Sequence, residues 1–144
     1  SLDGNGKMSK SENVNATIYL ADDDDTIRKK TMKAKSGLSP EQANSPMTED
    51  IQNLFSLMRL MTDANIVAQY EAAYADCSIR FGDMKKQLAE DMIRFVAPIR
   101  ERAADLQKDE ARLQRILKEG AEKARVSAQA TLQEARKLIG INYY

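Results

Sequence analysis

Two lysines and two serines lie close together near the start of the chain, in a segment whose composition suits phosphate binding. A pair of tight-turn dipeptides, Asp3-Gly4-Asn5-Gly6, precedes the cluster, which consists of Lys7, Ser9, Lys10 and Ser11. Ammonium groups and hydroxyls on a Gly-rich loop can stabilise the negative charge that builds up on a departing pyrophosphate. The alternative interpretation is a solvated basic loop made of turn-forming residues.

Two other glycine-containing binding loops do not fit this segment. Counted from Asp3, an EF-hand would need an oxygen ligand at Lys7, a glycine at Met8 and an acidic residue at Val14. A P-loop would need Ser or Thr directly after Gly6-Lys7, where Met8 stands. The sequence therefore argues against both a calcium loop and a Walker-type nucleotide loop.

Composition excludes several further classes of site. The 144 residues include no His and one Cys. Without an imidazole, His-dependent triads and the usual His-containing zinc sites are excluded. A lone Cys77 excludes an intrachain disulfide, fits a reducing compartment and favours a packing role. No apolar run approaches the ~20 residues that cross a bilayer, so we expect no membrane segment.

Charge is distributed unevenly along a formally neutral chain. Residues 1–78 carry 8 basic and 12 acidic side chains, whereas residues 79–144 carry 14 basic and 10 acidic side chains. A mild positive excess in the second half is compatible with a nucleic-acid partner but does not establish one.

Helical periodicity dominates the rest of the sequence. Helices are expected at about 24–35, from Thr48 through Met61, at about 63–76, from Asp83 through Leu106, and at about 109–139. Residues 36–47 form a linker, and a short extended piece is expected at 17–20. The predicted fold class is all-α: a helical bundle of about four to five helices, preceded by a loop that carries the Lys-Met-Ser-Lys-Ser sequence.

Apolar residues at helical spacing define the expected core. The predicted inward residues are Ile51, Leu54, Phe55, Met58 and Met61, then Leu88, Met92, Phe95, Val96, Ile99, Ala103 and Leu106, and finally Leu113, Ile116, Leu117, Ala124, Ala128, Ala135 and Leu138. Pro98 predicts a kink, and Gly120 predicts a close approach between helices. Asp83 is expected to cap its helix.

The segment Lys7-Met8-Ser9-Lys10-Ser11 resembles the ATP-binding loop of class I aminoacyl-tRNA synthetases. The same stretch continued to residue 30, together with residues 81–90, 98–102 and 120–125, resembles the bacterial tryptophanyl-tRNA synthetase family in the same order. The resemblance covers roughly residues 3–141. The tyrosyl-tRNA synthetase relative is the nearest rival within the class, and a helical protein-interaction module with a merely basic loop is the rival outside it.

The resemblance implies the chemistry of the whole enzyme. Tryptophan is activated by ATP, which carries Mg²⁺ with it, and the adenylate is then transferred to tRNA(Trp). Within the ATP-binding segment Lys7–Ser11, which includes Met8, Lys10 is the first choice for the pyrophosphate contact and Lys7 the second, with Ser9 and Ser11 as donors. The tryptophan pocket and most of the adenosine site are expected upstream, so this chain alone should hold no cofactor.

The resemblance also implies a division of the chain. Residues 1–21 would belong to a Rossmann catalytic domain, 22–47 to a connecting helix and linker, and 48–144 to an anticodon-binding helical domain. The parent enzyme would be a cytoplasmic homodimer. Candidate tRNA contacts, chosen by charge and helix position alone, are Lys85, Lys86, Arg94, Arg100, Arg102 and Lys108. For each of them the alternative is a solvated helix face.

Two expectations concern the N-terminal part of the chain. The four aspartates at 22–25 resemble a Mg²⁺ site, but helix N-terminal charge explains them more simply, so no metal site is predicted. Ser1 is not an initiator, so we expect a piece of a longer protein, with Ser1-Leu2 either native or a cloning remnant. Because residues 1–16 have few apolar side chains, we expect them to lack an anchor on the helices and to be mobile.

Overall fold

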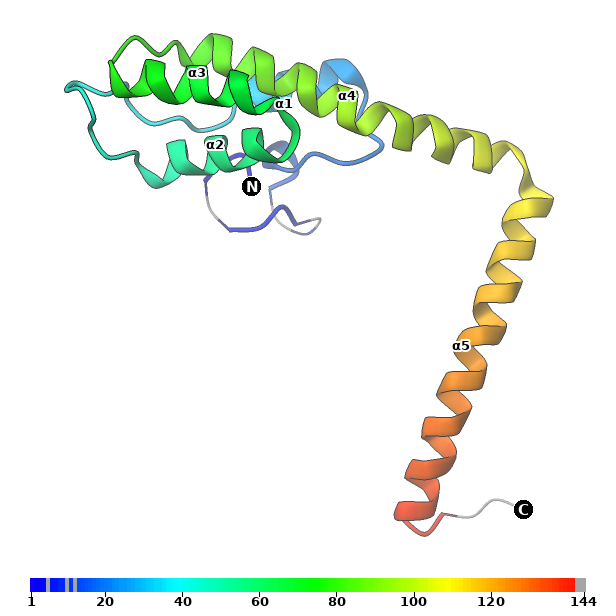
Figure 1. Ribbon diagram of the computed structural model, residues 1–144. Helices are drawn as coiled ribbons and strands as arrows, with labels where there is room; N and C mark the ends of the chain where they lie inside the picture. The colour runs from blue at the N-terminus through cyan, green and yellow to red at the C-terminus, as the bar shows by residue number, and fades with distance from the viewer. Residues whose placement is uncertain (5, 10, 12, 142–144) are drawn as a thin grey trace. The chain divides into compact units, whose positions relative to one another are not determined.

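The computed structural model describes residues 1–4, 6–9, 11 and 13–141. Its elements are the short 3₁₀ turn η1 (Val14–Ala16) and the helices α1 (Asp24–Met32), α2 (Glu49–Met61), α3 (Ala64–Ala75), α4 (Phe81–Lys108) and α5 (Glu110–Leu138) (Figure 1). No strand occurs within the described ranges, so the predicted all-α class is confirmed. The chain divides into two compact units, Ser1–Arg100 and Glu101–Tyr144.

Helix α1 begins where its charges predict, but it ends at Met32 rather than at about residue 35. The side chain of Asp23 accepts a hydrogen bond of 2.6 Å from the Thr26 amide and caps the N-terminus. This hydrogen bond holds the pKa of Asp23 below its ordinary value. Two acidic residues occupy the first turn and two basic residues the last, an order of charge that the helix dipole favours.

Helices α2 and α3 form as their apolar spacing predicts. Ile51, Leu54, Phe55 and Met58 are all buried on one face of α2. Asp63 caps α3 by accepting a hydrogen bond of 2.8 Å from the Asn65 amide. The two helices contact each other, and the Phe55 and Tyr74 rings pack edge to face with their centroids 6.4 Å apart.

Helix α4 differs from the prediction at its start. It begins at Phe81, because the Arg80 carbonyl accepts hydrogen bonds from the amides of both Asp83 and Met84. Asp83 therefore lies in the first turn rather than at the cap. Pro98 stays inside the helix.

The buried face of α4 is also narrower than its apolar spacing predicts. Leu88, Met92 and Val96 are buried as expected, but Phe95 remains 54% exposed and Ile99 40% exposed. The predicted inward position of these two residues is therefore wrong. Their side chains lie off the line of buried residues that recur at every fourth position.

The core of the first unit joins residues from distant parts of the sequence. Its largest fully buried side chains include Leu2, Ile27, Phe55, Met84 and Leu88. They come from the N-terminal segment and from α1, α2 and α4. Burial of such apolar surface is the main source of stability for a unit of this size.

Helix α5 buries none of its residues. The predicted stripe is present in the sequence, yet Leu113, Ile116 and Leu117 are 37%, 46% and 63% exposed. A side chain added at Gly120 would meet nothing within 4 Å. Periodicity identifies a face that can be covered, but not the surface that covers it.

No described helix is long and apolar enough to span a membrane.

A charged contact joins α1 to α4. Arg28 donates from Nε to Glu90 over 2.7 Å and from Nη2 over 3.2 Å. The hydrogen bond from Arg28 lowers the pKa of Glu90 below its ordinary value of 4.5, and the same contact raises the pKa of Arg28. The side chains are 43% and 50% exposed, so solvent screens the pair and its contribution is modest.

The Glu90→Gln variant should melt at a lower temperature than wild type at pH 7. Because the pKa of Glu90 is depressed in the folded state, the stabilisation is present above the unfolded pKa and is lost as pH falls through the folded pKa. The difference in Tm should therefore be smaller at a second, acid pH at which this carboxyl group is protonated in both the folded and the unfolded state. Glu41→Gln, at an exposed position with no described partner, is the control and should change little at either pH. An unchanged Glu90→Gln difference between the two pH values would contradict this assignment.

Candidate functional site

The N-terminal segment is anchored on the helical core through Leu2. This side chain is 1% exposed, and its backbone is held on both sides. Its amide donates to the Ala16 carbonyl over 2.9 Å, and its carbonyl accepts from the Lys35 amide over 2.8 Å. Asn53 of α2 also donates to the Ser1 carbonyl over 2.7 Å. The expectation that residues 1–16 lack an anchor is therefore wrong.

Glycine is required where the segment turns away from this anchor. Gly4 has φ +79°, a conformation that side chains other than glycine rarely adopt. A Cβ placed there would lie 2.1 Å from Oδ1 of Asp50, in the first turn of α2. Gly6 also has positive φ, at +72°. The positive φ of both glycines agrees with the two turns predicted from the sequence.

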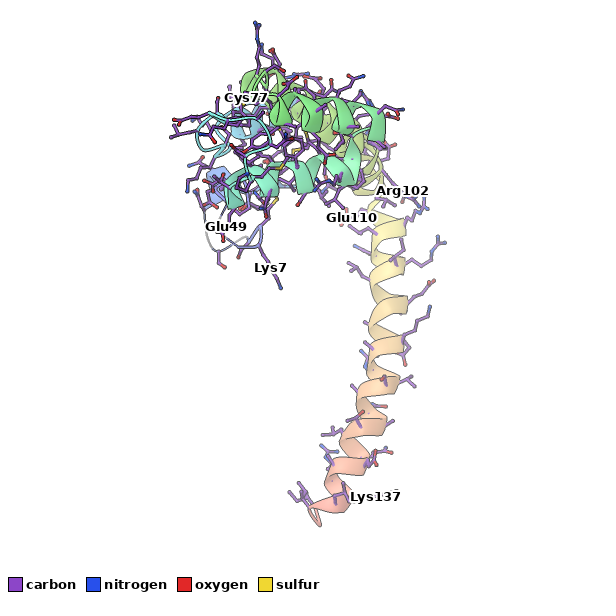
Figure 2. The ribbon with its side chains drawn as sticks, turned by 60° about the vertical axis from the view of Figure 1, so that its left-hand side comes forward. Lys7, Glu49, Cys77, Arg102, Glu110 and Lys137 are labelled. Atoms are coloured by element: carbon purple, nitrogen blue, oxygen red, sulfur yellow. The ribbon has the colours of Figure 1, made fainter. Side chains whose placement is uncertain are left out.

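In the signature segment, residues 7–11, the described residues Lys7 and Ser11 are exposed, and Met8 and Ser9 are half-buried. Lys7 is exposed, and Figure 2 shows its side chain projecting away from the helices. Met8 packs partly against the core, whereas the Ser9 and Ser11 hydroxyls lie 3.1 Å apart within hydrogen-bonding distance. Lys10, the predicted first pyrophosphate contact, lies outside the described residues. The described part thus offers one ammonium group and two neighbouring hydroxyls to solvent.

The far side of the signature segment is tied to α1 by a buried lysine. Thr17 donates from its hydroxyl to the Ser9 carbonyl over 3.2 Å. Lys30 of α1 donates to the Thr17 carbonyl over 2.9 Å and to Asp22 over 2.7 Å, and its ammonium lies 4.7 Å from the centre of the Tyr19 ring. A buried charge of this kind is tolerated because every contact around it is favourable. Lys30 therefore positions the segment that follows the signature residues.

Sequence reasoning missed Leu2, Thr17 and Lys30 as positioning residues. The available signal was that Leu2 is the only large apolar residue before Met8. Lys30 gave no signal of its own, because a lysine in the last turn of a helix usually faces solvent and complements the helix dipole. These residues hold the signature segment but do not belong to it.

The aspartates at 22–25 all have partners in the first unit. Asp22 pairs with Lys30, Asp23 caps α1, Asp24 pairs with Arg100, and Asp25 pairs with Arg28. Within the described residues, no group of three His, Cys, Asp or Glu side chains is arranged to hold a metal ion. The charges of this run thus serve the start of α1 and its contact with α4.

Most of the predicted tRNA-contact residues pair with carboxylates near them. The pairs are Lys86 with Asp83, Arg94 with Asp91, Arg100 with Asp24, and Lys108 with Asp105. The pairs of Lys86 and Lys108 join exposed side chains and are weak, so they do not remove these charges from the surface. Arg94 is itself exposed, but its partner Asp91 is 2% exposed. The Arg100 side chain is 29% exposed and also donates to the Asp22 carbonyl.

Lys85 and Arg102 differ from the other four, because neither has an ion-pair partner among the described residues. Lys85 is partly buried on α4, and this burial lowers the pKa of its ammonium group. Arg102 is exposed and belongs to the second unit. The six candidates are therefore divided between the two units, with Lys85, Lys86, Arg94 and Arg100 in the first.

The described residues thus place an exposed lysine and two neighbouring serine hydroxyls on an anchored segment of an all-α unit. The chain belongs to a family of class I synthetases: the family described as "tRNA synthetases class I (W and Y)" matches residues 1–97. The resemblance noted in the sequence is thereby confirmed.

Individual relatives specify the kind of enzyme more closely. The chain is 52% identical to a tryptophan–tRNA ligase of Porphyromonas gingivalis over 139 residues, which are 96% of this chain and 42% of that protein. It is 37% identical to a tryptophan–tRNA ligase of Streptococcus pyogenes serotype M1, over 99% of this chain and 42% of the relative. A tryptophan–tRNA ligase of Clostridium longisporum is 36% identical over 99% of this chain and 41% of the relative. The chain thus spans about two-fifths of the length of these relatives.

Proposed function

We propose that the complete protein containing this chain is a tryptophan–tRNA ligase. It would form tryptophanyl-adenylate from tryptophan and ATP and then transfer the amino acid to tRNA(Trp). The observation that carries this proposal is the signature segment: it lies within the residues matched to the family, and the described Lys7 projects into solvent from an anchored loop. The 52% identity to a tryptophan–tRNA ligase favours tryptophan over tyrosine as the amino acid.

The signature segment would act on the leaving group of adenylate formation. When the tryptophan carboxylate attacks the α-phosphate, negative charge builds up on the departing pyrophosphate. Lys10 and Lys7 would stabilise that charge, with hydrogen bonds from the Ser9 and Ser11 hydroxyls. Met8 would contribute by packing, since it is the one described residue of the segment that contacts the core. This role requires the rest of the nucleotide site from elsewhere in the protein.

Mg²⁺ would arrive with ATP as part of the substrate. The carboxylates at 22–25 are each engaged by an amide or a cation, which supports this route over a resident metal site. The parent would act in the cytoplasm as a homodimer.

The helices would contribute to tRNA binding. Lys85 and Arg102 have no ion-pair partner among the described residues, and Lys86, Arg94 and Lys108 keep 70%, 76% and 77% of their side chains exposed despite their carboxylate neighbours. A phosphate group can displace the weak surface pairs of Lys86 and Lys108. Arg100 is a weaker candidate, because its contacts with Asp22 and Asp24 tie it to the start of α1.

The Lys10→Ala variant of the complete enzyme should form adenylate much more slowly while binding tryptophan almost normally. The charge of Lys10 is needed as pyrophosphate departs, so its loss affects the transition state more than the ground state. We expect a decrease of about 100- to 1,000-fold, as for the loss of one oxyanion donor. Pre-steady-state adenylate formation measures it, with Lys118→Ala on the exposed α5 as the matched control. A wild-type rate in the Lys10→Ala variant would remove this residue from the mechanism.

The 144-residue chain by itself should be inactive. Its lysines then have no bound ATP to act on, and the advantage of holding the reactants in one site is lost. Tryptophan-dependent exchange of labelled pyrophosphate into ATP should equal the background without enzyme. Clear turnover by the purified chain would show that it contains a complete nucleotide site.

A further inference from the structure

A chain of hydrogen bonds runs from α1 to the middle of the signature segment. Thr17 is its central residue: its hydroxyl donates to the Ser9 carbonyl over 3.2 Å, and its carbonyl accepts from the Lys30 ammonium over 2.9 Å. Among the described residues, the contact from Thr17 to Ser9 is the one hydrogen bond that joins the signature segment to a residue outside it. The conformation of Ser9 therefore depends directly on Thr17.

The α1 end of this chain of hydrogen bonds is firmly held. Ile27, on the preceding turn of α1, is fully buried, and Lys30 is 9% exposed. The Lys30 ammonium meets the Thr17 carbonyl, the Asp22 carboxylate and the Tyr19 ring, three partners for its three N–H donors. Asp22 also accepts from the Tyr19 amide over 3.0 Å, which closes the stretch between Thr17 and α1. Thr17 is thus held from the α1 side before any ligand binds.

The other end of the chain of hydrogen bonds orients two hydroxyl groups. The Ser9 and Ser11 hydroxyls lie 3.1 Å apart, and the Ser9 hydroxyl oxygen accepts from the Ser11 amide over 3.4 Å. A hydrogen bond to the Ser9 carbonyl fixes the backbone from which both of these contacts arise. Donors that are placed before the reaction stabilise a developing charge without the cost of moving into position.

Thr17 is suited to act through Ser9 rather than on a substrate. It is 5% exposed, and its hydroxyl proton is already used in the hydrogen bond to Ser9. Its position outside the signature segment also separates its effect from the charge of the lysines. Only the hydroxyl group of Thr17 carries this role, because a side chain of the same shape without that group has no donor.

We propose that Thr17 is a positioning residue for adenylate formation, whose hydroxyl holds Ser9 in the conformation that receives the departing pyrophosphate. The inference rests on the proposed function and deepens it by naming a residue outside the signature segment that sets the rate of the first step. A single neutral hydrogen bond makes a modest net contribution, so its loss slows the reaction without abolishing it.

The test compares Thr17→Val with Thr17→Ser in the complete protein. Valine keeps the branched shape of threonine and removes the donor, whereas serine keeps the donor. Pre-steady-state adenylate formation per active site should fall about 3- to 10-fold in Thr17→Val and stay within about twofold of wild type in Thr17→Ser. In the reverse reaction the KM for pyrophosphate should rise in Thr17→Val, while the Kd for tryptophan should not change.

Thr131→Val on α5 is the matched control. The Thr131 hydroxyl also donates to a backbone carbonyl, that of Ser127, over 3.3 Å, but this contact lies within α5. Its removal should leave the rate of adenylate formation at the wild-type value. If Thr17→Val does not fold, Thr17→Ala removes the same hydroxyl with less bulk and should show the same decrease.

The outcomes separate this assignment from the ligase function. A wild-type rate in the folded variants that lack the Thr17 hydroxyl would overturn the assignment and leave the ligase function standing. A Thr17→Ser rate as low as that of Thr17→Val would also overturn it, because the hydroxyl would not be the cause. So would a loss of tryptophan affinity in parallel with the rate, which indicates general damage to the site. A wild-type protein that forms no tryptophanyl-adenylate would overturn the proposed function, and the assignment of Thr17 would fail with it.

Discussion

The burial of a single side chain, Leu2, connects the candidate phosphate-binding segment to the helical core. Complete burial of a leucine contributes about 2 kcal/mol to the free energy of unfolding. The two backbone hydrogen bonds of Leu2 also fix its orientation on the core. One of them reaches Ala16, beyond the signature segment, and the other reaches Lys35, beyond α1. The two ends of the segment between Leu2 and Ala16 are therefore held together, and the position of Lys7 depends on this closure.

Because only the two ends of the segment are held, Lys7 between them stays accessible. Such accessibility suits a segment that supplies only part of a nucleotide site. Lys30 and Thr17 fix the return of the chain toward α1, while Lys7 remains exposed and the hydroxyls of Ser9 and Ser11 contact each other. A loop held at its ends limits the conformational entropy lost when a phosphate group binds. The arrangement is therefore consistent with a catalytic contribution that becomes effective only when the rest of the nucleotide site is present.

The sequence predicted the helices well because local signals determine them. The acidic run at the start of α1 and the apolar spacing of α2 each act within a few residues, and both helices appear in the structure as expected. The turns at Gly4 and Gly6 also depend on a local signal, because a turn-forming dipeptide predicts each of them. The family could be recognised for the same reason: the signature residues are contiguous.

Features that depend on distant contacts could not be predicted. Leu2 is buried because it meets side chains of helices far along the chain, and no neighbouring residue indicates this. Conversely, the apolar stripe of α5 predicted burial, yet none of its residues is buried. An open cavity between α3 and α4 combines Tyr70 with Arg80, which become neighbours only when the intervening loop folds back. Spacing predicts a face, whereas tertiary contacts decide what covers it.

Hydrogen exchange on the 144-residue chain without nucleotide tests the anchoring of the loop most directly. The amides of Leu2 and Lys35 should exchange at least about 100-fold more slowly than in an unfolded chain, because each is hydrogen-bonded and the Leu2 side chain between them is buried. The amides of Lys7 and Met8, which have no backbone acceptor among the described residues, should exchange at nearly unfolded rates. Unprotected exchange at Leu2 and Lys35 would contradict the account, because the loop would then have no fixed ends.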